Sequence, residues 1–485
     1  MEAAINKEKK RLYPLGLKVM LVISFFYMIG QMTINFNLVL YATQELGFSR
    51  SGITVIFGVF WALGTVYSLL GGYLSGKYGY KQAVILGISL EIVAFLLLTV
   101  KSTLFLYFGL AFFAVGAHFA VPAMNCTISQ LYGPGDTRRH SGFLLNYVAL
   151  NIGSLIASIG SGFLAQIFGF SYVFLFPSII LFLAVGIFIV FNNYIDYHTE
   201  SLMSDQEKRG FTQKTKDFIK MLIVALLSIS VFALIIAHAK TLNIWIIIVA
   251  AMAYVYVLFI SFKYYTGAAR RKMLLFVVLC IASIVFWLLY NLAPTALTLF
   301  IQHNVDRNIL GTLIPTQAYS GLNPIVIIIF GPIISWGLIK LGNKGKKVSN
   351  LTKFIIALIM MGLGYLLLVP SIPASHFALV GSIWIVFSYL LQSVGELFIG
   401  PVAQAMVGEL VPREKEGMMM GLTLLNLGCS SAIATYFANY AYINTNNLRL
   451  SDISFEHAFA LYGILAVVVG ILLFAFSPLL KKMMK

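Results

Sequence analysis

The chain has 485 residues, of which 60% are hydrophobic and only 10% are charged. Soluble domains carry about 25% charged residues, so the composition excludes a soluble globular protein and predicts a polytopic membrane protein. The net charge of +16 could indicate nucleic-acid binding in a soluble protein, but the basic residues here lie between apolar runs. We therefore expect the lipid bilayer as surroundings and no nucleic-acid partner.

Apolar runs long enough to cross a bilayer, which takes about 20 helical residues, recur along the whole chain. Six precede a charged stretch near residue 200, two follow it, and six more follow the basic link GAARRK. The runs cover about 15–42, 52–75, 83–100, 103–132, 142–168, 171–194, 218–239, 243–262, 273–302, 316–339, 354–370, 377–410, 418–442 and 457–479. The first run is too long for a signal-peptide core, so we expect no cleavable signal.

The 6 + 2 + 6 arrangement predicts an all-α membrane protein with two six-helix bundles and two extra helices. We expect a first bundle in 1–200, a charged linker with a two-helix insertion in 201–271 and a second bundle in 272–485. Paired bundles of this kind are common in secondary transporters, whose site lies between them near the midplane.

The distribution of basic residues predicts the orientation. With the N-terminus inside, 28 of the 33 Lys and Arg residues fall on inner segments and five on outer ones. The outer five are Arg50, Lys101, Lys240, Arg307 and Arg449. This asymmetry predicts an even number of spans and both termini in the cytoplasm.

No motif for catalysis or metal binding stands out. The three cysteines, Cys126, Cys280 and Cys429, lie inside apolar runs without ligand-like spacing. The histidines are scattered, and there is no His-x-x-x-His or paired-acid motif. We expect no catalytic residue, no metal site and no cofactor, although a proton gradient could drive transport.

One carboxylate, Glu396, lies in the middle of the apolar run 377–410, and Pro401 follows it five residues later. A charge at membrane depth costs at least about 2.5 kcal/mol, so it usually faces a cavity or a partner. A proline is expected to distort the helix, and the freed backbone groups need protein or water nearby. The pattern predicts a water-lined path beside Glu396.

Several stretches resemble the proton-dependent oligopeptide transporter family of the major facilitator superfamily. The first bundle contains GPGDTRRHSGFLLNYVALNIGSL, similar to a family loop ending in Asp-x-Arg-Arg and a Tyr-x-x-x-Asn-x-Gly pattern. The second contains FWLLYNLAPTALTLF, HNVDRNILGTLIP and YSGLNPIVI, and the run around Glu396 matches Gly-Glu-Leu-x-x-Ser-Pro with Gly400 for the serine. The resemblance implies the major facilitator fold, alternating access and peptide-like substrates.

Charged positions of the family pattern are neutral here. The resemblance places the helix 1 Glu-x-x-Glu-Arg motif, a later arginine, a helix 4 lysine and a helix 7 glutamate on uncharged residues. These are Ser24, Tyr27, Met28, Asn35, Val121 and Asn291. The resemblance thus implies an outer gate formed by Asn35 and Asn291, and replacing both charges avoids an unpaired buried ion that would cost several kcal/mol.

Other site positions of the family are retained. The resemblance implies substrate contacts by Asn151, Trp287, Asn323 and Glu396, and Tyr147, Asn35 and Asn291 are further candidates for such contacts. Tyr147 lies one turn before Asn151 on the same helix face. Asparagine in membrane helices also serves simply to bond neighbouring helices. For the asparagines and Tyr147, packing therefore stays open as the alternative.

Glu396 is the expected proton carrier, and His118 is a candidate partner because it lies one turn before the lost helix 4 lysine position. The alternative is that His118 packs in its helix and donates to a backbone carbonyl. Glu91 is a second intramembrane acid, either near the cytoplasmic interface or paired with a polar neighbour. Asp136 can cap its turn or pair with Arg138 and Arg139.

The leading hypothesis is a monomeric, non-enzymatic secondary transporter of di- or tripeptides or peptide-like molecules in the inner membrane, with proton coupling through Glu396. An uncoupled facilitator for another small amine or amide solute is one alternative. A membrane sensor or scaffold that kept the fold without transporting is another, and an intramembrane enzyme is the third.

Overall fold

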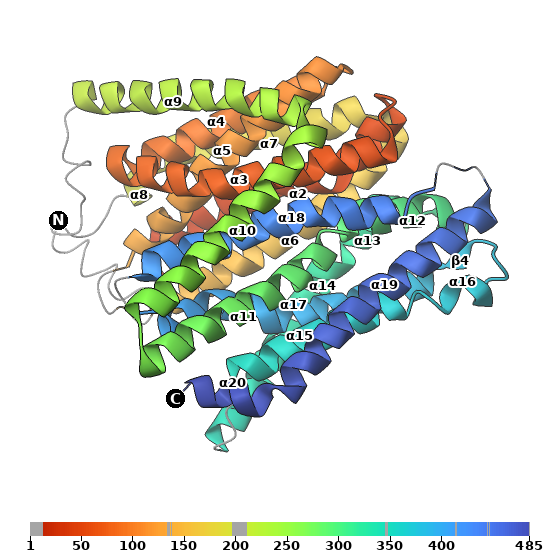
Figure 1. Cartoon of the computed structure of the whole chain (residues 1–485). Coiled ribbons are helices and arrows are strands. Elements are labelled where there is room, and N and C mark those ends of the chain that lie inside the picture. Colours follow the sequence, from red (N-terminus) through yellow and green to blue (C-terminus); the bar gives the residue numbers. More distant parts are fainter. Residues whose placement is uncertain are drawn as a thin grey trace. The chain divides into compact units, whose positions relative to one another are not determined.

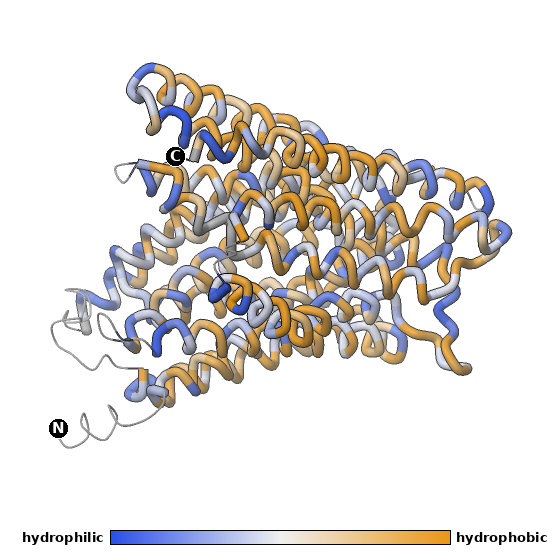
Figure 2. The backbone as a smooth tube through the Cα atoms, turned by 90° about the horizontal axis from the view of Figure 1, so that it is seen from below, coloured by the Kyte–Doolittle hydropathy of each residue, from blue (hydrophilic) through white to orange (hydrophobic). Residues whose placement is uncertain are grey.

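The computed structural model describes residues 13–132, 136, 138–195, 211–344, 348–412, 415–443, 445 and 447–484. Within these residues, fourteen helices are long and apolar enough to span a membrane. Figure 2 shows hydrophobic residues along the helices and hydrophilic ones gathered toward helix ends and connections. The predicted number of spans and the all-α membrane fold are confirmed.

The chain packs as two compact units whose edges differ from the predicted bundle boundaries. Unit 1 comprises Met1–Asn37 and Leu63–His238, and unit 2 comprises Leu38–Ala62 and Ala239–Lys485. The division cuts through the first two spanning helices, α2 (Leu15–Gln44) and α3 (Arg50–Tyr78). These two helices therefore contribute to both units.

Unit 1 is a helical bundle built around α4 and α5. Its remaining elements are parts of α2 and α3, and its complete helices are α4 (Tyr80–Leu98), α5 (Thr103–Gln130), α6 (Arg138–Phe168), α7 (Phe170–Val190), α8 (Asn192–Ile195) and α9 (Phe211–Ala237). α4 packs against α5 and α7, and α9 lies along α5 (Figure 1). Glycines permit the closest approach, since a Cβ on Gly87 would lie 2.6 Å from the Gly116 carbonyl oxygen.

Unit 2 is built around α15, α17 and α19, which pack side by side (Figure 1). Its complete helices are α10 (Ala239–Tyr264), α11 (Gly267–Tyr290), the π-helix η1 (Ala293–Leu297), α12 (Thr298–Asn304), α13 (Thr316–Ser320), α14 (Leu322–Asn343), α15 (Asn350–Leu366), α16 (Ser371–Ala374), α17 (Ser382–Leu410), α18 (Glu416–Tyr440), α19 (Leu448–Ala475) and α20 (Ser477–Met484). All the residues predicted for the second bundle that the structure describes belong to this unit.

Two small strand pairs lie in the connections of unit 2. β1 (Val305–Asp306) pairs in parallel with β4 (Val380–Gly381), with Val305 opposite Val380. β2 (Asn308–Ile309) and β3 (Thr312–Leu313) form an antiparallel pair, with Asn308 opposite Leu313. These two-residue strands are small exceptions to an otherwise helical fold.

The hairpin formed by the end of α2 and the start of α3 belongs to unit 2 because it packs against α18. A Cβ on Gly58 of α3 would lie 2.3 Å from Thr435 Cγ2 and 2.7 Å from the Ser431 carbonyl oxygen. Only glycine permits this approach, so Gly58 is the residue that lets α3 lie directly on α18.

The two helices of the insertion are divided between the units. α9 belongs to unit 1, whereas α10 belongs to unit 2. On α10, the Asn243 amide donates to the Ala432 carbonyl at 3.1 Å and to Thr435 Oγ1 at 3.0 Å, both on α18. An amide that satisfies a backbone carbonyl across a helix interface fixes how the two helices pack.

The helix break expected beside Glu396 is absent, and an irregular segment lies elsewhere in the unit. α17 continues from Ser382 through Pro401 to Leu410. The prediction of a break was wrong because a proline removes only one helical hydrogen bond, and neighbouring structure can accommodate that loss. A π-helical segment occurs instead at η1, which contains Pro294 and is separated from α11 by Asn291 and Leu292.

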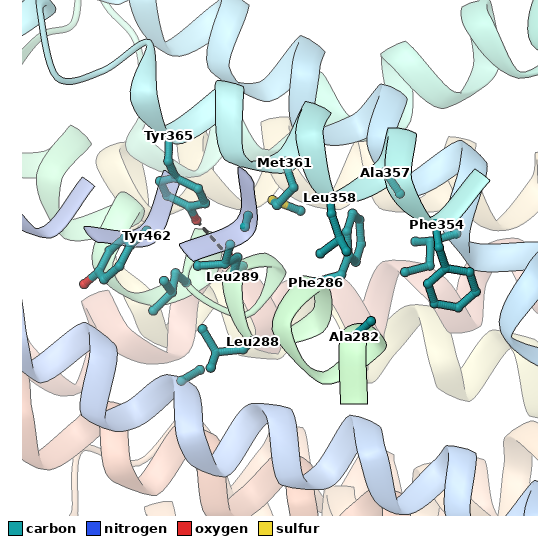
Figure 3. Packing of buried hydrophobic residues seen from close by; sticks show 14 of the residues in the cluster. Ala282, Phe286, Leu288, Leu289, Phe354, Ala357, Leu358, Met361, Tyr365 and Tyr462 are labelled. Atoms are coloured by element: carbon teal, nitrogen blue, oxygen red, sulfur yellow. Dashed lines mark hydrogen bonds between the residues drawn. The ribbon is translucent and has the colours of Figure 1, made fainter. Parts of the chain in front are cut away.

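The core of unit 2 fixes α11 against α15. Figure 3 shows Phe286 and Leu289 of α11 packed among Leu358, Met361 and Tyr365 of α15. The Tyr365 hydroxyl donates to the Leu289 carbonyl at 2.8 Å. The Leu289 carbonyl also accepts from the Leu292 backbone N–H at 3.1 Å, so the Tyr365 hydroxyl adds a second hydrogen bond at the end of α11. The core thereby positions the last turn of α11, which carries Trp287, Tyr290 and Asn291.

Candidate functional site

Glu396 lies at the centre of a polar cluster within unit 2. The Asn323 side chain donates from Nδ2 to Glu396 Oε2 at 2.7 Å and to Ser393 Oγ at 3.0 Å. The Tyr290 hydroxyl also hydrogen-bonds to the Glu396 side chain. Three helices contribute, since Glu396 and Ser393 lie on α17, Asn323 on α14 and Tyr290 on α11.

The local sequence explains why Asn323 can reach Glu396. α13 ends at Ser320, Gly321 links the two helices, and α14 starts at Leu322, so Asn323 lies in a first helical turn. Pro324 follows it without cost, because backbone N–H groups in a first turn have no intrahelical partner. Asn323 is therefore held at a helix start with its amide free to bond across to α17.

The neighbours of Glu396 are neutral hydrogen-bonding groups. Glu396 takes part in no ion pair among the residues that the structure describes. Its side chain is half-buried, so the carboxylate is neither fully enclosed nor openly solvated. An acid in such surroundings can exchange a proton or meet a positively charged group of a ligand.

Trp287 and Asn291 lie beside this cluster on α11. The Trp287 ring packs edge-on against Tyr290 with ring centroids 5.3 Å apart, and against Phe286 at 5.4 Å. Asn291 donates from Nδ2 to the Trp287 carbonyl at 2.8 Å, which closes the end of the helix. The tryptophan therefore orients the tyrosine that bonds Glu396, while a substrate contact by Trp287 or Asn291 stays a prediction.

In unit 1, Asn151 and Tyr147 are neighbours on α6. Asn151 donates from Nδ2 to the Tyr147 carbonyl at 2.8 Å. Asn151 is 8% exposed, whereas the Tyr147 side chain is 45% exposed. The predicted one-turn spacing is present, and the exposed tyrosine is the more accessible of the two. Their roles in substrate binding stay predictions.

His118 has a partner within its own helix. Its Nδ1 lies 2.7 Å from the Ala114 carbonyl, and because a carbonyl only accepts, Nδ1 carries the hydrogen. The ring lies against α3, where a Cβ on Gly64 would be 2.3 Å from His118 Cε1. This is the packing arrangement that the sequence left open for His118, and pairing with Glu396 stays a prediction. Asn35 lies half-buried on α2, and its gate with Asn291 also stays a prediction.

Glu91 has polar neighbours on α2 and is far from both ends of its own helix. The Gln31 amide donates from Nε2 to Glu91 Oε2 at 3.1 Å and to the Tyr27 hydroxyl at 2.7 Å. Tyr27 also hydrogen-bonds to the Glu91 side chain. Of the two positions considered from the sequence, the structure thus shows pairing with polar neighbours.

Sequence reasoning missed Tyr290 and Ser393 beside Glu396. Both lie three residues from a predicted site residue, Tyr290 after Trp287 and Ser393 before Glu396. Side chains three apart share a helix face, so this spacing could have revealed them. Among the described residues, no group of three or more His, Cys, Asp or Glu side chains could hold a metal ion.

The fold and its buried acids define a multi-pass membrane protein of the kind built from two bundles of helices. The model of the POT family matches residues 17–454. The chain belongs to this family, the proton-dependent oligopeptide transporters, as the resemblance in its motifs predicted.

Curated relatives match over most of their length. The chain is 30% identical over 454 residues to dipeptide and tripeptide permease A of Erwinia pyrifoliae, covering 91% of this chain and 89% of the relative. It is 29% identical over 451 residues to dipeptide and tripeptide permease A of Escherichia coli strain K12, covering 91% and 88%.

Solved structures share the fold. The chain matches a crystal structure of peptide transporter POT in complex with sulfate with a TM-score of 0.84 at 22% identity, covering 97% of this chain and 96% of the other. A crystal structure of tetrameric PepTSo2 matches with a TM-score of 0.84 at 22% identity, covering 96% and 98%. These likenesses establish the major facilitator fold.

Proposed function

We propose that this protein is a secondary active transporter that carries di- and tripeptides, or small molecules like them, across the inner membrane by alternating access. Its family and the permeases it resembles support the substrate class. The observation that carries the proposal is the Glu396 cluster, in which a half-buried intramembrane acid has neutral hydrogen-bond partners from unit 2 among the described residues. Those surroundings support the proposal that Glu396 couples transport to protons.

The neutral neighbours suit an acid that changes its charge during a transport cycle. A fixed cation beside the carboxylate would favour the ionised state throughout, whereas amide and hydroxyl donors can bond either state. Asn323 bonds Glu396 and Ser393 at once, so it holds the acid in place in both states. Peptide contacts are proposed for Asn151, Trp287 and Asn323, with Tyr147, Asn35 and Asn291 as further contacts.

Both termini are proposed to lie in the cytoplasm, and the transporting unit is proposed to be a monomer. The separation of 28 inner from 5 outer Lys and Arg residues supports the orientation. One chain contains both Glu396 and Glu91 with their hydrogen-bond partners, which supports the monomer. Labelling of single cysteines placed at each terminus tests the first proposal, and the mass of the protein in detergent tests the second.

The experiment is uptake of a mixed di- and tripeptide pool into liposomes that contain the purified chain. With the membrane potential clamped at zero, each coupled proton supports about tenfold accumulation for a pH gradient of one unit. We expect wild type to accumulate peptide, and Glu396→Gln to lose about tenfold of that accumulation. Glu409→Gln is the matched control, since Glu409 lies on the same helix but is exposed and bonds Asn350.

Each part of the proposal can fail separately. No uptake of any peptide by folded wild type would overturn the substrate class. Uptake that ignores the proton gradient would leave an uncoupled facilitator. Unchanged accumulation by Glu396→Gln would show that another group carries the proton.

A further inference from the structure

Glu91 is the most enclosed acid of unit 1. Its side chain is 0% exposed, and it is the twelfth residue of the 19-residue helix α4, so it lies well inside the membrane-spanning part. Among the described residues, its hydrogen-bond partners lie on α2, where Gln31 donates to Oε2 and Tyr27 is the second partner. The other carboxyl oxygen, Oε1, is buried without a hydrogen-bond partner in the described part of the chain.

This environment suits a neutral acid better than an ionised one. A carboxylate has about four acceptor positions, and here one of its oxygens has no donor at all. Burying an ion without a counter-ion costs several kcal/mol, whereas a protonated carboxyl avoids that cost. A nonpolar residue would be more favourable at a purely structural position on α4. The presence of an acid there therefore indicates a function that uses its proton.

Among the residues that the structure describes, Glu91 takes part in no ion pair with a cation. α4 packs against α5, α7 and α9, and meets α2 through Gln31. The titratable or charged residues of these helices within unit 1 are Lys18 and Tyr27 on α2, Tyr107, His118 and Cys126 on α5, Tyr172 on α7, and Lys214, Lys216, Asp217, Lys220 on α9, with Tyr80 and Lys81 on α4 itself. Of these, only Tyr27 bonds Glu91, while His118 bonds the Ala114 carbonyl and faces Gly64.

The charged first turns of α9 lie beside the start of α4 and not beside Glu91. The Gln82 amide donates to the Lys214 carbonyl at 3.2 Å, which places this part of α9 beside the start of α4. Gln82 is nine residues before Glu91, about 14 Å along the helix. The ion pair between Lys220 and Asp217 also belongs to this end. These charges therefore do not compensate a carboxylate at Glu91.

The Glu91 side chain packs against Gly116 of the neighbouring helix α5. A Cβ on Gly116 of α5 would lie 3.1 Å from Glu91 Cγ and 2.6 Å from the Gly87 carbonyl. Glycine at position 116 thus lets the stem of Glu91 pass between α4 and α5 toward α2. The acid is accommodated by both neighbouring helices.

We propose that Glu91, held by Gln31 and Tyr27, is a second proton-binding site of this protein, located in unit 1. The site holds a proton on the carboxyl group in the enclosed arrangement described here. When the site opens, that proton passes to water and the carboxylate keeps the electron pair. The proposal rests on the proposed function, because binding and release of this proton can drive accumulation only if the protein transports peptides.

The connection of α2 to both units gives the site a way to open. Residues up to Asn37 pack in unit 1, and residues from Leu38 pack in unit 2. Any rearrangement of one unit against the other must therefore be transmitted to α2. Gln31 lies only six residues before that boundary, so the donors of Glu91 move when α2 moves, while Glu91 stays on α4.

The first test measures accumulation. Under a one-unit pH gradient and zero membrane potential, Glu91→Gln should accumulate peptide about tenfold less than wild type, because one coupled proton is lost. Peptide exchange without a gradient should persist, since glutamine has the shape of the neutral acid. The control Glu409→Gln should match wild type in both assays. Accumulation by Glu91→Gln equal to wild type overturns the proposal.

A swapped variant separates proton binding from structure. Gln31→Glu combined with Glu91→Gln exchanges the two ends of the 3.1 Å hydrogen bond and keeps one acid at the site. We expect it to recover the accumulation that Glu91→Gln loses. Recovery is not expected if Glu91 serves only to pack α4, and a swap that stays as deficient as the single variant counts against proton binding.

Infrared difference spectroscopy tests the site without transport. Spectra of wild type taken at acidic and alkaline pH should contain a band of a protonated carboxyl that Glu91→Gln removes and Glu409→Gln keeps. If wild type transports no peptide but this band is present, the proposed function fails and the proton site stands. If peptide is transported and the band is absent at acidic pH, the proton site fails and the proposed function stands.

Discussion

Glu91 in unit 1 and Glu396 in unit 2 have neighbours of the same kind but differ in enclosure. Each carboxyl accepts from an amide on another helix, Gln31 for Glu91 and Asn323 for Glu396, and each has a tyrosine beside it. Glu91 is fully buried, and one of its oxygens has no hydrogen-bond partner among the described residues, whereas Glu396 is half-buried. The neutral neighbours allow both acids to change charge, and enclosure decides what can reach them.

This difference assigns different tasks to the two acids. A half-buried carboxylate with aromatic neighbours such as Trp287 can meet a ligand as well as a proton. A carboxyl at 0% exposure has room for a proton and nothing larger. The comparison thus predicts that changes at Glu396 alter both peptide affinity and coupling, whereas changes at Glu91 alter coupling alone.

The largest expected effect comes from removing both acids. Glu91→Gln combined with Glu396→Gln should lower accumulation about a hundredfold under a one-unit pH gradient, because two independent proton sites are lost. Steady-state accumulation of labelled dipeptide in liposomes measures it. A double variant no worse than either single variant would show that the acids do not bind protons independently.

The same comparison predicts a difference in peptide affinity. Peptide half-saturation should change in Glu396→Gln and stay at the wild-type value in Glu91→Gln, because only Glu396 is open enough to touch a ligand. Concentration dependence of peptide exchange without a gradient measures this. An equal change in both variants would contradict the division of tasks.

Adding a methyl group to a glycine that packs beside either acid should destabilise the protein to a similar extent. A Cβ on Gly116 would lie 2.6 Å from the Gly87 carbonyl, and a Cβ on Gly395 would lie 2.9 Å from the Ala357 carbonyl. Gly116→Ala and Gly395→Ala should each destabilise the protein by about 1–3 kcal/mol, as overpacking does. Thermal unfolding in detergent measures it.

Gly160→Ala is the matched control for both glycines, because a Cβ at that position of α6 meets nothing within 4 Å. It should unfold at or slightly above the wild-type temperature, since alanine favours helix. Beyond stability, Gly116→Ala should also reduce proton-driven accumulation, because the added methyl group presses on the stem of Glu91. Stability of Gly116→Ala equal to that of Gly160→Ala would contradict the close approach of α4 and α5.

The fold was predictable because its signals are local. Each spanning helix is a run of apolar residues, and the charges between runs are counted without knowing the packing. The division into units was not predictable, because it depends on contacts such as Gly58 against Ser431, which are distant in sequence. The break predicted at Pro401 was wrong because sequence does not reveal whether a helix tolerates its proline.

The candidate site was predictable only in part. The resemblance singled out Asn323 and Glu396, but nothing in a spacing of 73 residues indicates that their side chains bond at 2.7 Å. Glu91 was visible as an expensive acid, yet its partner Gln31 lies 60 residues away on another helix. An intramembrane acid is thus recognised from sequence, whereas its partners depend on helix packing.

A smaller effect is expected from the donors of the two acids. Gln31→Leu and Asn323→Leu each remove an amide that makes two hydrogen bonds, and a hydrogen bond of this kind in membrane proteins is worth about 1 kcal/mol. Gln31→Leu should destabilise more, because Glu91 has no access to water, whereas half-buried Glu396 can bond water instead. Thermal unfolding at constant pH compares them, and a larger loss for Asn323→Leu would reverse the order of enclosure.

The smallest effect is expected at Asp136, an acid outside the membrane-spanning segments. Arg138 donates to both of its oxygens, with Nη2 at 2.7 Å from Oδ2 and Nε at 3.0 Å from Oδ1, and the Arg138 backbone N–H caps Oδ1 at 2.9 Å. These bonds lower the pKa of Asp136 below its usual range. The sequence left open whether Asp136 caps its turn or pairs with Arg138 and Arg139, and the structure shows both the cap and the pair with Arg138.

The lowered pKa of Asp136 determines the pH range in which this residue contributes to stability. Its contribution is complete above the ordinary aspartate pKa of about 3.9 and is lost only as the pH falls through the lower folded value. Asp136→Asn should cost less than about 1 kcal/mol, as for an exposed ion pair, and should leave pH dependence between about pH 5 and 8 unchanged. Transport and unfolding measured across that range in Asp136→Asn and wild type should therefore run parallel. The pH dependence should persist in Asp136→Asn and disappear when Glu91 and Glu396 are both replaced by glutamine. In that case it arises from the two intramembrane acids.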